Sequence, residues 1–256
     1  MTFTAIKTTV LFGIVASLCG ISQVRAADIP PLPADASVDQ VLAGLQARGD
    51  GLRDMTADVN LSDIDQATAD STSHSGHFLL QNLPGGGGRV RVTFIERIEG
   101  VRIYNEKHEY TLSGGMLVDR DYDKKTEVDR QIAKPGERIN LLKLGQGPFP
   151  LPIGQDPAEV HQQFDVTLVP AAKDDPPDTI HIALKPAPNT DMAARFSKID
   201  VWVDRKAVMP VRITSTDAAG ERVETTDLTN IHLNQGLSDA DFALPAVDGW
   251  DVKQEQ

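Results

Sequence analysis

Two histidines, His74 and His77, are the first candidates for chemistry, and they follow the acidic residues Asp63, Asp65 and Asp70. Imidazole and carboxylate groups bind zinc, but a zinc site needs three or four such ligands that converge on the ion. The spacing of these five residues matches no closed ligand set. A polar surface loop is the favoured interpretation, and an enzyme with a hydrolytic site built from these residues stays as an alternative.

Other signatures of catalysis are weak. The glycine run 85–88 is followed by "RVRVTF", which predicts a strand, whereas a phosphate-binding loop would lead through Lys-Ser/Thr into a helix. The single cysteine, Cys19, lies near the N-terminus. No serine stands in a nucleophile-elbow context, although a carboxylate pair assembled from distant strands stays open. We therefore expect no enzyme, no cofactor and no metal.

The first 26 residues have the pattern of a secretory signal peptide. Lys7 precedes an apolar run, 10–21, that is too short to span a bilayer, and Val24 and Ala26 supply the small residues of a cleavage site. We expect cleavage near Ala26, which also removes Cys19. A Pro-rich leader, 27–36, and one domain, 37–256, would then remain.

The charge balance limits the partners of the chain. Among its 256 residues, 25 are basic and 37 are acidic, a formal charge of −12. Loss of residues 1–26 removes Lys7 and Arg25 and no acidic residue, which gives −14. Such a charge argues against nucleic acid and anionic headgroups as electrostatic partners. The mature length suits one large domain with a single core.

The hydrophobic pattern predicts a mainly β (α+β) fold. Ser37 and Gln40 have capping-box spacing at the start of an amphipathic helix. From Met55 onward the apolar residues alternate with polar ones, which predicts a long antiparallel meander with one packed face. The segment 62–76 is predicted to be a polar loop. Helical pieces are expected at 139–144 and after Asp156, an N-cap followed by proline.

The C-terminal third resembles the LolA-like family of periplasmic lipoprotein carriers. It contains in order "IDVWVD", "PVRI", a "DAAG" turn, "LTNIHLN", a closing Phe and a final "GWDV". Upstream, "VLAGLQARGDGLRDMTADV", "GHFLLQ", "SGGMLVDRDYDKKTEV" and "HIALKPAP" are similar to earlier parts of that family. The resemblance implies a strongly curved antiparallel sheet, an incomplete β-barrel, with helices plugging its concave side and an apolar cavity between them.

The resemblance also implies where a ligand would bind. We expect a cavity wall and a movable lid formed by Val41, Leu42, Leu45, Phe78, Leu80, Val92, Phe94, Ile103, Leu142, Phe149, Val166, Leu168, Ile182, Leu184, Val201, Val203, Val211 and Ile213. Leu141 and Leu151 belong to the same expected lid. Arg89 and Arg91 fall near the position of a basic residue that handles ligand in the family. Trp202 alternates with the cavity row, so we expect it on the convex side, stacked on an arginine.

The function implied is a non-catalytic periplasmic carrier that shields the acyl chains of lipoproteins, or other lipids, for transfer to the outer membrane. Its expected partners are inner-membrane release machinery and an outer-membrane receptor, with the carrier itself a monomer. The alternative on the same fold is an envelope-stress sensor or regulatory lipid-binding module, which would have a stable protein partner instead of transfer activity.

Overall fold

The computed structural model describes residues 29–83, 87–133 and 153–255. Its twelve described strands form one curved sheet that does not close into a barrel. The order across the sheet is β12-β6-β5-β4-β3-β2-β1-β11-β10-β9-β8-β7, and the neighbours are antiparallel except for the parallel pair β12 and β6. The expected mainly β fold with a strongly curved, incomplete barrel is confirmed.

The first six strands form a meander of consecutive antiparallel neighbours. Their bounds are β1 Asp54–Asp65, β2 Ser71–Asn82, β3 Gly88–Glu99, β4 Arg102–Ser113, β5 Met116–Asp121 and β6 Thr126–Gln131. The second run is β7 Phe164–Val169, β8 Thr179–Pro186, β9 Phe196–Asp204, β10 Met209–Asp217 and β11 Arg222–Leu233, with β12 at Asp251–Glu255. β11 pairs with β1 and joins the two runs.

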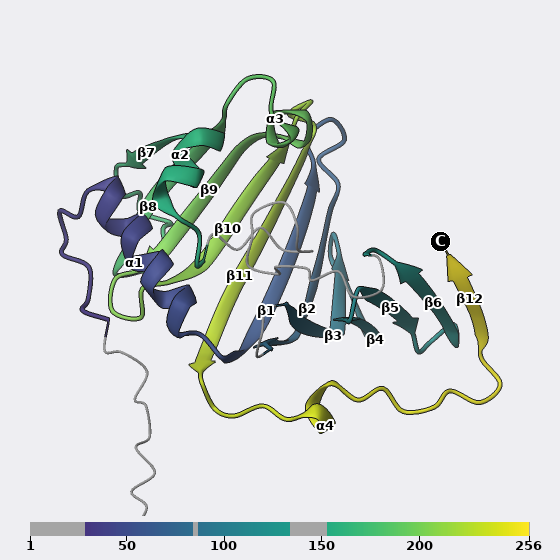
Figure 1. The fold of residues 1–256 in the computed structure, drawn as a ribbon. Helices are drawn as coiled ribbons and strands as arrows, with labels where there is room; N and C mark the ends of the chain where they lie inside the picture. Colours follow the sequence, from purple (N-terminus) through teal and green to yellow (C-terminus); the bar gives the residue numbers. More distant parts are fainter. Residues whose placement is uncertain (1–28, 84–86, 134–152, 256) are drawn as a thin grey trace, which may run out of the picture.

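Two helices lie against the concave face of the sheet. The helix α1, Val38–Gly51, begins at Ser37, whose Oγ accepts from the backbone N–H of Gln40 while the Gln40 side chain accepts from Ser37 N–H. The helix α2, Pro157–Gln163, is capped by Asp156. Both helices lie over the half of the sheet that holds β7–β10, as Figure 1 shows. The two helix starts that the sequence predicts are confirmed.

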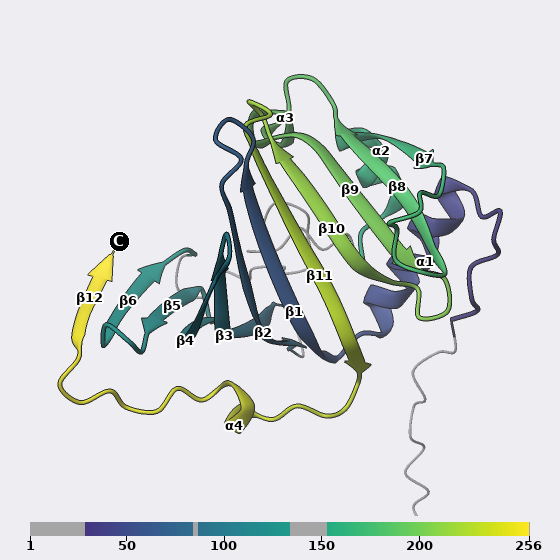
Figure 2. The same cartoon turned by 180° about the vertical axis from the view of Figure 1, so that it is seen from behind.

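The core lies mainly between α1, α2 and this half of the sheet. The apolar row of each strand faces inward, and α1 inserts Val41, Leu42 and Leu45. Other core residues with almost no exposed surface are Met55, Leu80, Ile153, Phe164, Ile182, Leu184, Ile199, Val201, Val203 and Met209. The reverse view in Figure 2 shows no helix over the convex side of β8–β11.

The predicted loop at 62–76 is wrong for most of its length. β1 continues to Asp65 and β2 begins at Ser71, so the turn between them is only 66–70. Polar side chains are compatible with strands here because backbone pairing holds the ladder, as between Asp63 and Thr72, and the side chains on one face remain in water. His74 and His77 therefore lie on a strand.

Two short helices, α3 Asp191–Arg195 and α4 Asp239–Phe242, complete the described part of the chain. The α4 helix belongs to a C-terminal strap, residues 234–250, that runs from β11 to β12 along the outside of the molecule (Figures 1 and 2). No helix among the described residues is long and apolar enough to cross a membrane.

Candidate functional site: an apolar pocket beside the helix-covered half of the sheet

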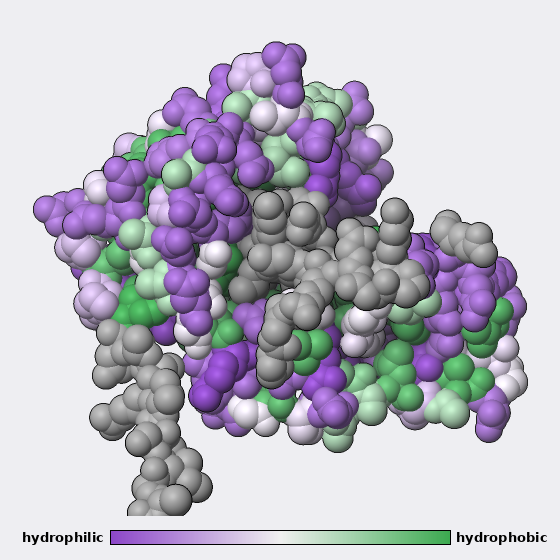
Figure 3. Space-filling model, in the orientation of Figure 1, coloured by the Kyte–Doolittle hydropathy of each residue, from purple (hydrophilic) through white to green (hydrophobic). Residues whose placement is uncertain are grey.

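An apolar pocket lies on the concave face of β2–β5, beside the half of the sheet that α1 and α2 cover. It has a volume of about 310 Å³ and opens to solvent. Among the described residues it is lined by Leu61, His74, Val90, Val92, Phe94, His108, Tyr110, Leu112, Leu117 and Glu224. Figure 3 shows hydrophobic surface on this side of the molecule, over β3–β6.

Strand register explains why these residues meet. Val90 pairs with Leu112 of β4, which pairs in turn with Leu117 of β5. Val92 pairs with Tyr110 in the same way. Since side chains of directly opposite residues share a face, three strands contribute one continuous apolar row. Leu117 and Tyr110 remain partly exposed, and this leaves the pocket open.

Four rings form one edge of the apolar pocket. His74 lies 5.3 Å from Phe94 between ring centroids, and Phe94 meets Tyr110 edge-on at 6.2 Å. His108 stacks on Tyr110 at 4.7 Å with 12° between the ring planes. Each histidine also meets a carboxylate, since His74 Nδ1 is 2.6 Å from Glu106 Oε1 and His108 Nε2 is 2.6 Å from Asp119 Oδ1. The ring row is thus apolar toward the pocket and polar behind it.

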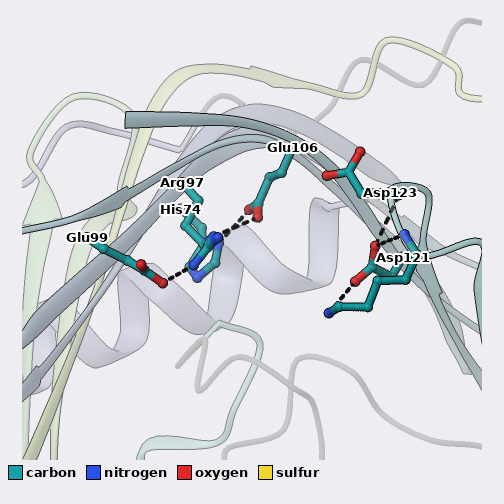
Figure 4. A network of polar contacts seen from close by, with 7 residues as sticks. His74, Arg97, Glu99, Glu106, Asp121 and Asp123 are labelled. Carbon is teal, nitrogen blue, oxygen red and sulfur yellow. Dashed lines mark hydrogen bonds and ion pairs between the residues drawn. The ribbon is translucent and has the colours of Figure 1, made fainter. Parts of the chain in front are cut away.

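A second, polar pocket adjoins the first and shares His74, His108 and Tyr110 with it. Its volume is about 550 Å³. Figure 4 shows its two charged sides, with Glu106 among the labelled residues on one of them and Asp121 on the other. The two pockets together form an amphiphilic site, in which an apolar compartment opens into a charged one.

Burial and neighbouring charges shift several protonation equilibria in the site. Burial, with the charges of Asp119 and Glu106, raises the pKa of Tyr110 to about 12, so its phenol stays neutral at neutral pH. Burial also raises the pKa of Glu224 at the apolar end. Burial lowers the pKa of His108, but the hydrogen bond and charge of Asp119 outweigh it, and the net pKa lies above its ordinary value.

The predicted cavity residues fall into four groups. Val92 and Phe94 line the apolar pocket. Leu142 and Phe149, together with the expected lid residues Leu141 and Leu151, lie outside the described residues. The others that are buried belong to the core and do not line this pocket: Val41, Leu42, Leu45, Phe78, Leu80, Val166, Ile182, Leu184, Val201, Val203 and Ile213.

Three predicted wall residues are not buried. Ile103 is 66% exposed, because it alternates out of phase with His108 and Tyr110 on β4 and therefore faces the convex side, opposite Ile98. Leu168 is 46% exposed on the edge strand β7. Val211 occupies a bulge, and the neighbouring Pro210 pairs with Val203 in its place. Strand alternation alone could not reveal the bulge at Val211.

The helix α1 is fixed to its surroundings at its C-terminal half. The carbonyl of Leu45 accepts from Gly154 N–H at 3.0 Å, and the Asn82 side chain donates to the carbonyl of Leu52 at 2.8 Å. Gly49 lies so near Gly154 that an added Cβ would stand 2.1 Å from the Gly154 Cα. We therefore place the ligand site on β2–β5, outside the contact surface of α1.

Arg89 and Arg91 lie on the face opposite the apolar pocket, because they alternate with Val90 and Val92. Arg89 Nη2 is 2.7 Å from Asp239 Oδ1, and its guanidinium lies 4.3 Å over the Phe242 ring. Arg91 donates to the carbonyl of Asp241. The two arginines hold the C-terminal strap and lie outside the apolar pocket.

The strap is held at two further points. Arg120 Nη1 donates to the carbonyl of Pro245 at 2.8 Å. Trp250 meets Tyr122 edge-on, with ring centroids 5.0 Å apart. The strap then leads into β12, which pairs with β6 and forms one edge of the sheet.

Trp202 lies on the face opposite Val201 and Val203, as its alternation predicts. Its ring stacks on His181 at 4.0 Å, and its Nε1 donates to Asp175 at 2.7 Å. The Arg212 guanidinium is 5.8 Å from the ring centroid. The predicted convex position and the arginine contact are confirmed, although the main stacking partner is a histidine.

The positions of His74 and His77 do not support a hydrolytic site that uses both histidines. His74 faces the concave side and meets Glu106, whereas His77 faces the convex side, where its Nδ1 is 2.8 Å from Asp58 Oδ1. The two imidazoles therefore cannot share one ion. Within the described ranges, no three His, Cys, Asp or Glu side chains are grouped to hold a metal.

Half of the pocket residues that the predicted site omits are on β4 and β5. They are Leu61, His74, Val90, His108, Tyr110, Leu112, Leu117 and Glu224. A signal for one strand is present in the sequence, since His108, Tyr110 and Leu112 alternate along it. The pocket itself depends on which strands α1 leaves uncovered, and the local pattern carries no such information.

No protein-family model matches the chain, and no curated protein matches it either. Solved structures do resemble it. A conserved uncharacterised protein from Thermus thermophilus is 12% identical with a TM-score of 0.48, over 86% of this chain and 100% of that one. LprF from Mycobacterium bovis is 15% identical with a TM-score of 0.46, over 81% and 96%. A LolA superfamily protein from Nitrosomonas europaea is 11% identical with a TM-score of 0.29, over 79% and 97%.

Proposed function

We propose that the protein is a non-catalytic carrier that shields acyl chains of a lipoprotein or another lipid in the apolar pocket. The observation that carries this proposal is the apolar pocket on β3–β5, where Val92, Leu112 and Leu117 line a space of about 310 Å³. Concave, mostly apolar pockets of this size are typical of small-ligand sites.

The energetics suit a carrier that must also release its ligand. An acyl chain that buries about eight methylene groups gains about 6 kcal/mol at about 0.8 kcal/mol each. Micromolar affinity requires about 8 kcal/mol, so one chain is held only weakly. A lipid with two or three chains would be held more firmly if further chains lie along the concave face. Binding of this strength would still allow the lipid to be transferred to a membrane.

The cellular setting belongs to the same proposal. The signal-peptide pattern of residues 1–26 supports export and a periplasmic location for the single mature domain, 37–256. A carrier there would receive its ligand from inner-membrane release machinery and deliver it to an outer-membrane receptor. The formal charge of −14 would keep an open apolar pocket soluble between these encounters.

A pocket-blocking variant tests the proposal. Leu117→Trp places a large ring at the partly exposed rim of the pocket, whereas Leu168→Trp makes the same change on the edge strand β7 outside it. A titration with a fluorescent acyl-chain probe should show binding by wild type and by Leu168→Trp, and at least tenfold weaker binding by Leu117→Trp.

Two results would count against the carrier. Equal probe binding by the two tryptophan variants would place the acyl chain elsewhere. Absence of probe binding by wild type, together with a stable complex with one envelope protein, would favour the sensor or regulatory alternative. Circular dichroism of each variant checks that the fold is intact.

A further inference from the structure

The polar pocket lies where the headgroup of a lipid bound in the apolar pocket would be placed. An inference about this headgroup rests on the proposed function. The two pockets share His74, His108 and Tyr110, so a lipid whose chain enters the first places its headgroup in the second. The shared rings are apolar on one side and meet carboxylates on the other. Amphiphilic ligands need this change from apolar to polar surroundings at one boundary.

Charges of both signs line the polar pocket. Among the described residues around it, three side chains are basic and four are acidic. On one side, Glu106 Oε2 is 3.3 Å from Arg97 Nε, and Glu99 pairs with the same guanidinium. On the other side, Lys124 Nζ is 2.8 Å from Asp121 Oδ2. Figure 4 shows these two clusters facing each other across an open space.

The balance of charge selects among headgroups. Two carboxylates surround Arg97, so that side has one negative charge in excess and favours an ammonium group. The opposite side holds two basic and two acidic side chains, Lys107 and Lys124 with Asp121 and Asp123, so its charges balance. Lys124 pairs with Asp121 but is 78% exposed, so a phosphate can reach it. A purely anionic headgroup would meet four carboxylates, and like charges brought together cost free energy. A group with one charge of each sign can satisfy both sides.

We propose that the polar pocket binds a zwitterionic amine-and-phosphate headgroup, with the ammonium beside Glu99 and Glu106 and the phosphate beside Lys124. The existing ion pairs do not oppose this. The Arg97–Glu99 pair has side chains 31% and 45% exposed. Such pairs contribute only about 0–1 kcal/mol, so exchanging this partner for a ligand group costs little. The Glu99 side chain is 45% exposed and therefore accessible to such a ligand.

A charge-neutral double variant tests the headgroup site. Glu99→Gln with Lys124→Gln removes one charge of each sign, so the net charge of the protein is unchanged. The matched control, Glu221→Gln with Lys206→Gln, makes the same two changes at exposed positions outside both pockets. Each protein is incubated with vesicles of equal parts dioleoyl phosphatidylethanolamine and dioleoyl phosphatidylglycerol, reisolated, and its bound lipids are quantified by mass spectrometry.

We expect the control protein to take up phosphatidylethanolamine in preference to phosphatidylglycerol. In the double variant, the ratio of bound phosphatidylethanolamine to bound phosphatidylglycerol should be about fivefold lower, which is equivalent to about 1 kcal/mol. Uptake of dioleoylglycerol, which has the chains without a charged headgroup, should be the same in both. An equal phospholipid ratio in both proteins would overturn the headgroup site while leaving the chain pocket intact. Failure of every protein to take up dioleoylglycerol would overturn the proposed function and this inference with it.

Discussion

His108 lies parallel to Tyr110, with ring centroids 4.7 Å apart, while its Nε2 is 2.6 Å from Asp119 Oδ1. The imidazole thus has an aromatic ring on one side and an anion at one nitrogen, at the boundary between the apolar and polar pockets. A protonated imidazole is favoured by both neighbours. The boundary of the candidate site therefore carries an imidazole whose pKa lies above its ordinary value.

The first prediction concerns this titration. The pKa of His108 is raised above 6.5, so the His108–Asp119 pair contributes stability fully below pH 6.5 and loses it as the pH rises through the raised value. NMR of the imidazole resonances should show this pKa, and Asp119→Asn should lower it. The difference in unfolding free energy between wild type and His108→Gln should shrink between pH 6.5 and the measured pKa. A pKa at or below 6.5 in wild type would contradict the assigned pair.

A second prediction concerns Trp202, which faces away from the apolar pocket. Trp202→Phe keeps a ring over His181 but removes the N–H that donates to Asp175. We expect a loss of about 1 kcal/mol in unfolding free energy, measured by urea denaturation, and unchanged binding of the acyl-chain probe. Loss of probe binding with an intact fold would show that this face of the sheet takes part in the site.

A pair of glycines tests the close packing of α1. An alanine usually stabilises a helix interior by about 1 kcal/mol relative to glycine. Gly49→Ala should instead destabilise the protein by more than about 1 kcal/mol, because its Cβ would collide with the Gly154 backbone. Gly51→Ala meets no atom within 4 Å and should be neutral or stabilising. Equal effects of the two substitutions on thermal unfolding would mean that α1 stands away from 153–154.

The C-terminal strap gives a fourth prediction. Arg89→Gln removes both the ion pair with Asp239 and the cation–π contact with Phe242. We expect faster hydrogen exchange in the strap, 234–250, and unchanged binding of the acyl-chain probe, since Arg89 lies on the face opposite the pocket. Arg102→Gln, at an exposed arginine of β4 outside both pockets, is the matched control. Weaker probe binding by Arg89→Gln, but not by the control, would show that Arg89 contributes to ligand binding.

Much of the fold follows from local sequence signals. Capping at Ser37 and Asp156 starts the two longer helices, and strand alternation puts Val201 on one face and Trp202 on the other. The sequence did not predict the bulges at Ile95 and Val211. An extra residue in one strand reverses the alternation of its side chains but does not change the amino-acid composition of the strand. Polar residues in β1 and β2 also hid the true length of those strands.

The candidate site depends on longer-range relationships. Val90, Leu112 and Leu117 come from three strands whose register sets their meeting. Which apolar row becomes a core and which becomes a pocket depends on where α1 packs, and α1 lies over the half of the sheet with β7–β10 through contacts far apart in the chain. Sequence periodicity identifies the apolar rows of the strands but not which of these rows a helix covers. The sequence therefore predicts core and pocket residues as one set.

The most direct test of the acyl-chain pocket is mass spectrometry of lipids that remain bound to the mature protein after purification from the periplasm. The account predicts a stoichiometric acyl-bearing lipid on wild type and on Leu168→Trp, and its loss from Leu117→Trp. The same lipid recovered in equal amount from Leu117→Trp, or no lipid recovered from any of the three proteins, would contradict it.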